Sequence, residues 1–223
     1  MRRLRPMFKQ TALITFAPDS DAGARDALIA RATAQVQADL NYVGDGLPVS
    51  FNGGDKVWHT HFANEAAWVA SGIDAVLDAI EADPIVQQLD AAAYAVSRFS
   101  VPQPALANGV YRALFLSFFK TVDPAIEKQF GDEVAAMPDY IDTIVNWALN
   151  PVVKARGAKR WHYVWEQEYA SLDGLRGLYM SSAYHWGHVD RWFDCEMPEF
   201  MVDDRLCHSA STLTNSVMAD YAR

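Results

Sequence analysis

The twenty residues LRGLYMSSAYHWGHVDRWFD, positions 175–194, hold two histidines, two tryptophans and two tyrosines. On a helix, five of these rings lie on or near one face: Tyr179, His185, Trp186, His188 and Trp192. An imidazole titrates near neutral pH and a phenol donates to a developing oxyanion, so Tyr179 and His185 could form a general acid/base pair. The alternative is that His185 satisfies a buried carbonyl and that His188 is solvated.

A second aromatic group lies on the segment RWHYVWEQEY, residues 160–169, which we predict to be a strand. Alternation divides it into two faces: Trp161, Tyr163, Trp165 and Gln167 on one, and His162, Val164, Glu166 and Glu168 on the other. The matching set on the predicted strand 56–62 is Lys56, Trp58 and Thr60. These rings suit an aromatic ligand, although they could equally fill a core.

A metal site is a further hypothesis, because four histidines occur in two close pairs. His59 and His61 would share one face of a strand, and His185 and His188 one face of a helix. No acidic residue supports the helical pair, and strand parity places His59 and His61 opposite Trp58, toward the helices. Cys195 and Cys207 have no metal spacing, and nucleotide-binding glycine motifs are absent from the sequence. We therefore expect neither a metal nor another cofactor.

The elements that must position these residues repeat along the chain. VWHTHFANEAAW can be laid over VWEQEYASLDGL, which puts Trp58 on Trp165 with a period of about 105 residues. Both halves read β-α-β-β-α-β, the ferredoxin-like order, and the proline-rich PQPALANG separates them. We predict an α+β fold of tandem ferredoxin-like repeats, with domains 1–102 and 109–223.

Several element boundaries follow from periodicity and from glycine and proline. They include strands at 11–18, 56–62, 92–101, 110–120, 140–151 and 199–204, helices at 19–40, 64–90, 123–138 and 171–194, and a turn-rich stretch between 41 and 55 with one short strand near 49–51. A sheet with helices on one face only leaves an apolar face uncovered, so each half needs a partner sheet.

The second half resembles the stress-responsive dimeric α/β-barrel family over about residues 110–205. The likeness rests on LSFFK, MPDY, EQEYASLDGL and LYMSSAYHWGHVD. The family's HPxH motif is broken here, with Ser182 and Ala183 in place of its first histidine and proline. Its site tyrosine and last histidine fall on Tyr179 and His185, and a further site histidine falls on Ala113. The resemblance implies two packed sheets, the Trp165 face turned toward the barrel interior, and a pocket in or beside each half.

Composition excludes several classes of partner. The net charge is −9 and basic residues cluster only in MRRLR at the start, so we expect no nucleic-acid partner. MRRLR also resembles the start of a signal peptide, but the apolar stretch after it is too short. No segment approaches the ~18 apolar residues of a membrane span. We predict a cytoplasmic protein that could form a homodimer.

From these residues we predict a cofactor-independent lyase that cleaves a C–C bond of an aromatic or phenolic small molecule by retro-aldol chemistry. His185 would be the base or its orienting group, and Tyr179 the oxyanion donor or the acid. The substrate would be held by Lys56, Trp58, Phe115, Tyr163, Trp165, Trp186 and His188. The alternatives are an aldol cyclase or isomerase, a non-catalytic stress-associated ligand-binding protein, and a metal-dependent oxygenase.

Overall fold

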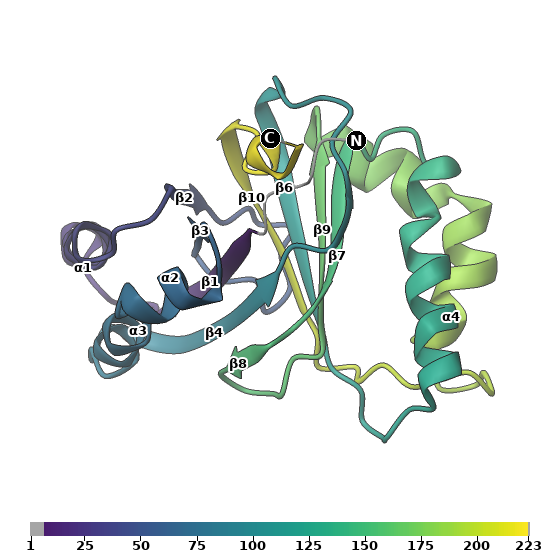
Figure 1. Cartoon of the computed structure of the whole chain (residues 1–223), viewed down its shortest axis with the longest axis horizontal. Coiled ribbons are helices and arrows are strands. Elements are labelled where there is room, and N and C mark those ends of the chain that lie inside the picture. The colour runs from purple at the N-terminus through teal and green to yellow at the C-terminus, as the bar shows by residue number, and fades with distance from the viewer. Residues whose placement is uncertain (1–6, 223) are drawn as a thin grey trace.

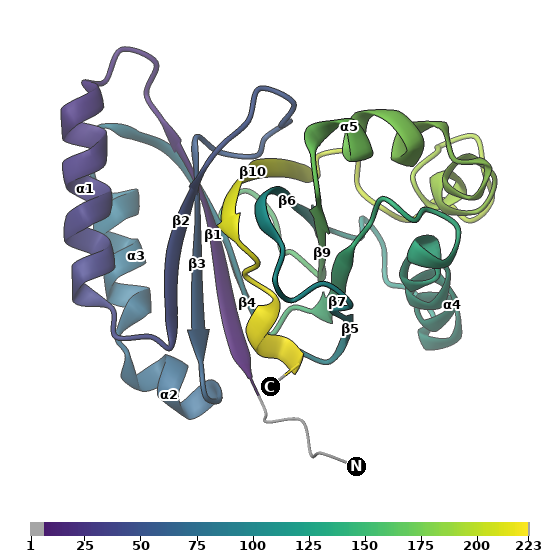
Figure 2. The same cartoon turned by 90° about the horizontal axis from the view of Figure 1, so that it is seen from above.

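Two antiparallel sheets face each other in the computed structural model, and helices cover the outer face of each sheet (Figures 1 and 2). The structure describes residues 7–222. The arginine-rich start MRRLR lies outside the described residues.

The first sheet has the strand order β2-β3-β1-β4-β8. The elements of the first half are β1 (Phe8–Phe16), α1 (Ala22–Gln35), β2 (Leu40–Asp45), β3 (Lys56–Phe62), α2 (Glu65–Ala70), α3 (Ile73–Glu81), β4 (Val86–Ala95) and β5 (Arg98–Ser100). Helix α1 begins where the Asp21 side chain accepts a hydrogen bond from the Ala24 backbone N–H. Gly72, with a φ of 69°, separates α2 from α3.

The second sheet has the strand order β10-β6-β9-β7-β5. The elements of the second half are β6 (Ala107–Leu116), α4 (Pro124–Ala135), η1 (Met137–Asp139), β7 (Asn146–Pro151), β8 (Lys154–Arg156), β9 (Tyr163–Tyr169), α5 (Leu172–Gly174), η2 (Leu175–Tyr179), η3 (His185–Val189), η4 (Asp190–Trp192), β10 (Cys207–Asn215) and η5 (Ala219–Ala222). Asp123 caps α4 and Pro124 opens it, which suits the first helical turn.

Four main strands of each half lie in the same spatial order: fourth, first, third, second. This order belongs to the ferredoxin-like arrangement, and the chain has an α+β fold with two antiparallel sheets. Two short strands cross between the sheets. β5 pairs with β7 in the second sheet, and β8 pairs with β4 in the first. Backbone pairing therefore joins the two halves in addition to side-chain packing.

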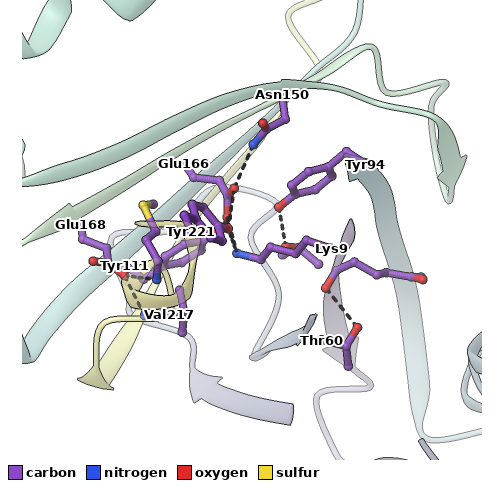
Figure 3. A network of polar contacts seen from close by, with 12 residues as sticks. Lys9, Thr60, Tyr94, Tyr111, Asn150, Glu166, Glu168, Val217 and Tyr221 are labelled. Atoms are coloured by element: carbon purple, nitrogen blue, oxygen red, sulfur yellow. Dashed lines mark hydrogen bonds and ion pairs between the residues drawn. The ribbon is translucent and has the colours of Figure 1, made fainter. Parts of the chain in front are cut away.

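The space between the sheets holds a polar network as well as apolar side chains (Figure 3). Lys9 on β1 and Glu166 on β9 are fully buried and form an ion pair across the interface. Glu166 also accepts hydrogen bonds from Tyr111 (2.7 Å), Tyr221 (3.1 Å) and Asn150 (3.2 Å). The charge is thus surrounded by donors, as a buried carboxylate requires.

The structure reverses the predicted facing of the strands. Trp58 and Trp165 point toward the helices of their own halves. His59 points toward the other sheet, where its ring centroid lies 4.4 Å from that of Tyr111, and Glu166 does the same. Both faces of each sheet are buried, so alternation separates the two sets without identifying which one faces the helices.

Several predicted boundaries are also wrong. The helix predicted over 64–90 ends at Glu81, and β4 begins at Val86. Strand β2 occupies part of the stretch predicted as turns, and the strand predicted near 49–51 is only an isolated bridge from Phe51 to His208. The strand predicted over 199–204 is only a bridge at Val202, and the true last strand is β10. Small and polar residues dominate β10, so its sequence lacks an apolar signal.

Candidate active site

A cavity of about 220 Å³ lies in the second half, between the sheet and the helical segment that covers it. It is lined by Arg112, Leu114, Leu116, Val134, Met137, Trp165, Tyr179, Met180, His185, Val189, Asp190, Phe193, Leu206 and His208. Most of these side chains are apolar, and the few polar ones come from different elements. This combination is typical of a site that holds one small molecule.

Three neighbouring strands form the floor of the cavity. Arg112, Leu114 and Leu116 alternate along β6, so all three point to the same face, while Trp165 comes from β9 and His208 from β10. The register pairs Arg112 with Gln167 on β9 and with Ala210 on β10. The small Ala210 lies beside the long Arg112 side chain.

The outer wall is an irregular helical segment. Two π-helical turns, η2 and η3, carry Tyr179 and His185. Such turns are rare and occur often at functional sites. Glu133 on α4 fixes the end of this segment, because its carboxylate accepts hydrogen bonds from Arg191 (2.5 Å) and from the Trp192 indole (2.8 Å). The wider π turn also explains why His188 does not share the buried face of Trp192.

Arg112 is the central polar residue of the floor, and only 2% of it is exposed. Its Nε donates to His208 Nε2 (3.0 Å), and its Nη1 donates to Tyr179 Oη (3.0 Å) and to Gln167 Oε1. The guanidinium carbon lies 4.9 Å from the centre of the Tyr179 ring. Arg112 therefore fixes the Tyr179 hydroxyl in both position and orientation.

Tyr179 and His185 lie next to each other, with ring centroids 4.6 Å apart. Burial raises the pKa of Tyr179, and the Arg112 charge opposes that shift. Burial lowers the pKa of His185 to about 4, and the Arg112 charge contributes to the decrease. At neutral pH the site therefore holds a protonated phenol and a neutral imidazole.

The orientation of His185 suits a proton acceptor. Its Nε2 lies 3.4 Å from Asp190 Oδ1, and its Nδ1 is buried with no hydrogen-bond partner. A proton on Nε2, facing the carboxylate, leaves the lone pair on Nδ1. The arrangement can thus accept a proton from a molecule in the cavity.

Unsatisfied polar atoms lie at this cavity, and also between the sheets, where His59 and His61 have four ring nitrogens without a partner among residues 7–222. Among the described residues, buried atoms without a hydrogen-bond partner include Trp165 Nε1, Gln167 Nε2, Tyr169 Oη, His185 Nδ1 and His208 Nδ1. Trp165, His185 and His208 line the cavity itself, and Gln167 accepts a hydrogen bond from Arg112, which lies at the cavity floor. Such groups are uncommon in native proteins and call for a missing partner.

The structure brings together three of the predicted site residues, Tyr179, His185 and Trp165. Trp58 packs in the first half and donates to Asn41 (2.7 Å), and Lys56 pairs there with Asp45 (2.7 Å). Neither lines the cavity, so we withdraw both from the site.

Four further predicted residues also lie away from the cavity lining. Phe115 packs between the sheets against Trp161, and Tyr163 donates to Glu127 (2.7 Å) on α4. Trp186 is 66% exposed, and the exposed His188 stacks on Tyr184. Their aromatic character alone could not separate packing from ligand contact.

The geometry is against the four-histidine metal site. His59 and His61 lie between the sheets, and His185 and His188 lie beyond the helix-facing side of the second sheet. Within residues 7–222, no group of three or more His, Cys, Asp and Glu side chains is placed to hold a metal ion.

Arg112, His208 and Asp190 are cavity residues that the sequence did not suggest. For Arg112 a signal exists, since it interrupts the apolar run VYRALFLSFF. For His208 no usable signal exists, because the sequence places the last strand at 199–204 and not at β10, the strand that carries His208. The residue paired with Trp58 is Ala12 and the residue paired with Trp165 is Leu114; two positions earlier on these strands lie Gln10 and Arg112. Gln10 thus takes the place of Arg112 in the first half, where it accepts a hydrogen bond from the Trp68 indole (2.5 Å). The charged floor is thus a property of the second half.

Comparison with known proteins shows a shared fold without detectable sequence kinship. No family model matches the chain, and no curated protein matches it. Among solved structures, an anthrone oxidase-like protein aligns with a TM-score of 0.66 at 9% identity, covering 94% of this chain and 91% of the other. A candidate monooxygenase from Lactobacillus acidophilus aligns with a TM-score of 0.51 at 12% identity, covering 95% and 98%. A chlorite dismutase from Candidatus Nitrospira defluvii aligns with a TM-score of 0.51 at 10% identity, covering 97% and 95%.

These likenesses contradict the predicted function. The neighbours are enzymes named as oxidase-like, monooxygenase and chlorite dismutase, and none is named as a lyase, a cyclase, an isomerase or a storage protein. The prediction of a cofactor-independent lyase, with its cyclase, isomerase and non-catalytic ligand-binding alternatives, is therefore wrong. The predicted ferredoxin-like fold is supported. In the described part of the chain, every helix is too short or too polar to cross a bilayer.

Proposed function

We propose that this protein is an oxidase or monooxygenase that oxidises a small aromatic molecule in the cavity of its second half. One observation carries the proposal: three side chains that line an apolar cavity of about 220 Å³, Trp165, His185 and His208, each have a buried polar atom without a partner among the described residues. A ligand with one polar edge and an apolar body would satisfy the polar atoms and fill the space. The oxidative names of the structural neighbours support the reaction class.

The substrate class follows from the name anthrone oxidase-like and from the pair Tyr179 and His185. An anthrone has a CH2 group between aromatic rings, and loss of a proton from it gives an enolate. Oxidation by dioxygen converts this CH2 into C=O and releases water. Two C–H bonds and the O–O bond break, one oxygen atom enters the product and the other leaves as water. The carbon supplies every electron that dioxygen takes up, so the balance needs no separate reductant.

Each residue of the site has a role in this scheme. His185 Nδ1, buried and without a partner, accepts the proton from the CH2 group. Tyr179, protonated and held by Arg112, donates a hydrogen bond to the enolate oxygen. The Trp165 indole N–H is a further donor at the floor.

Anthrone oxidation followed by quinone absorbance tests the proposal. His185→Ala and Tyr179→Phe should each lower kcat by about 10²–10⁴ relative to wild type while the circular dichroism stays unchanged. Trp58→Phe, a change at the matching place in the other half, should keep the wild-type rate. Full activity of both cavity variants would reject the site, and failure of wild type on anthrones and related phenols would reject the reaction.

The same proposal includes the architecture. We infer that the halves derive from one duplicated unit and that their sheets close into a barrel. Bridges from Gly46 to Ser211 and from Phe51 to His208 join one pair of sheet edges, and the crossed strands β5 and β8 join the opposite region. Homodimer formation, predicted from the sequence, stays a prediction; sedimentation or light scattering would test it.

A further inference from the structure

We propose that the cavity binds its substrate as an oxygen anion, a phenolate or enolate, with Arg112 as the counter-ion. The identity of the substrate body rests on the proposed function; the binding of an anion rests on the geometry alone. Arg112 is buried, lines the cavity and lies at its floor.

The charge of Arg112 has no compensating carboxylate. Among residues 7–222, no Asp or Glu oxygen forms an ion pair with it, and its three hydrogen bonds go to neutral groups. Those bonds use Nε and Nη1, and the guanidinium also interacts with the neutral hydroxyl of the buried Tyr169. An isolated buried charge is costly, and structures normally pair it. A bound anion would provide the missing partner.

The groups that contact Arg112 are uncharged at neutral pH, so none of them balances its charge. The Arg112 charge, followed by burial, lowers the pKa of His208 to about 3, so His208 stays neutral and accepts from Nε. Burial raises the pKa values of Tyr169 and Tyr179, which stay protonated. Asp190 is the acid on the cavity wall, and burial raises its pKa too. Its carboxylate contacts His185 rather than Arg112.

The rest of the cavity restricts which anion fits. Its other lining residues are mostly apolar, including Leu114, Leu116, Val134 and Met137. A small inorganic anion would leave this surface uncovered, whereas an aromatic ring carrying one ionised oxygen covers it and places the charge at the floor. The preferred form is therefore the conjugate base of an aromatic hydroxyl or enol. Binding this form would also ease the deprotonation that starts the proposed oxidation.

The probe for this inference is 4-nitrophenol, which titrates near neutral pH and whose ionised form absorbs at longer wavelength. Bound to wild type, its apparent pKa should be about one to two units below its value in water, a tenfold to hundredfold preference for the anion. Arg112→Gln should abolish the shift, Arg112→Lys should keep part of it, and the surface variant Arg31→Gln should leave it unchanged. An unshifted or raised pKa of the bound probe in wild type would overturn the inference.

A wild-type comparison keeps the test decisive if the Arg112 variants do not fold. The methyl ether 4-nitroanisole cannot ionise, so its affinity should not change with pH, while that of 4-nitrophenol should rise at least tenfold as the probe ionises. Equal, pH-independent affinities would overturn anion binding. Neither probe carries the CH2 group of the proposed substrate, so these assays measure binding without turnover. A protein that binds the anion but fails to oxidise anthrones would therefore refute the proposed reaction only.

Discussion

Replacing Lys9 by methionine should strongly destabilise the protein, because it removes one member of a buried ion pair between the two halves. Lys9 and Glu166 are both fully buried, on β1 and β9 respectively. Burial lowers the pKa of Lys9, and Glu166 opposes that shift, so Lys9 depends on Glu166 to keep its charge. Without the ammonium group, the Glu166 carboxylate would keep only neutral donors (Figure 3).

The expected cost follows from what remains around Glu166. Breaking a fully buried pair by removing one partner typically costs ~3–5 kcal/mol, since an uncompensated charge stays buried. The hydrogen bonds from Tyr111, Tyr221 and Asn150 favour the lower end of this range. A loss of ~3 kcal/mol is a large part of the ~5–15 kcal/mol that stabilises a typical domain. The double variant Lys9→Met, Glu166→Gln should recover at least ~1 kcal/mol of it, because no charge is left buried.

Urea unfolding at pH 7 measures these differences. Lys128→Met is the control, because Lys128 pairs with Asp132 at the surface of α4 and 75% of its side chain is exposed. That change should cost less than ~0.5 kcal/mol. The reasoning is refuted if Lys9→Met costs less than ~1 kcal/mol, or if the double variant is as unstable as the sum of the two single variants.

Three further predictions concern titration and the cavity floor. Activity should fall only as the pH drops through about 4, where His185 becomes protonated. Arg112→Gln should raise the pKa of His185, because the nearby positive charge is gone, and so move this loss of activity to higher pH; pH profiles of kcat/KM check both. Trp165→Phe should weaken 4-nitrophenol binding about fivefold by removing a free donor, while Trp58→Phe should leave binding unchanged, as a fluorescence titration would show. Burial raises the pKa of Glu168 above its ordinary value of 4.5, so between these two pKa values the folded state holds a proton that the unfolded chain has released. The free energy of unfolding of wild type relative to Glu168→Gln should therefore decrease as the pH rises through that window, and urea unfolding at several pH values measures the decrease.

The element order was predictable, because it depends on short segments with clear periodicity. Strand β3 occupies residues 56–62 as predicted, and α4 begins one residue after its predicted start. Strand β10 was not predictable, because residues such as Ser209 and Ser211 are fully buried yet carry no apolar signal. Their burial depends on the opposite sheet, which lies far away in the sequence.

The candidate site was partly predictable for a similar reason. Tyr179 and His185 lie close together in sequence on one helical segment, so local spacing was enough to join them. Arg112 and His208 reach the same cavity from two other strands, and only the register of the second sheet brings them there. The facing of Trp58 could not be deduced, because both sides of its strand are buried.

Isotope labelling with ¹⁸O₂ during anthrone oxidation tests most directly whether the second-half cavity is an oxidative site. The proposed chemistry predicts one labelled oxygen atom in each new carbonyl group, at a rate that His185→Ala lowers by at least ~10²-fold. Product that carries its new oxygen from water, or labelled product formed equally fast by His185→Ala, would contradict it.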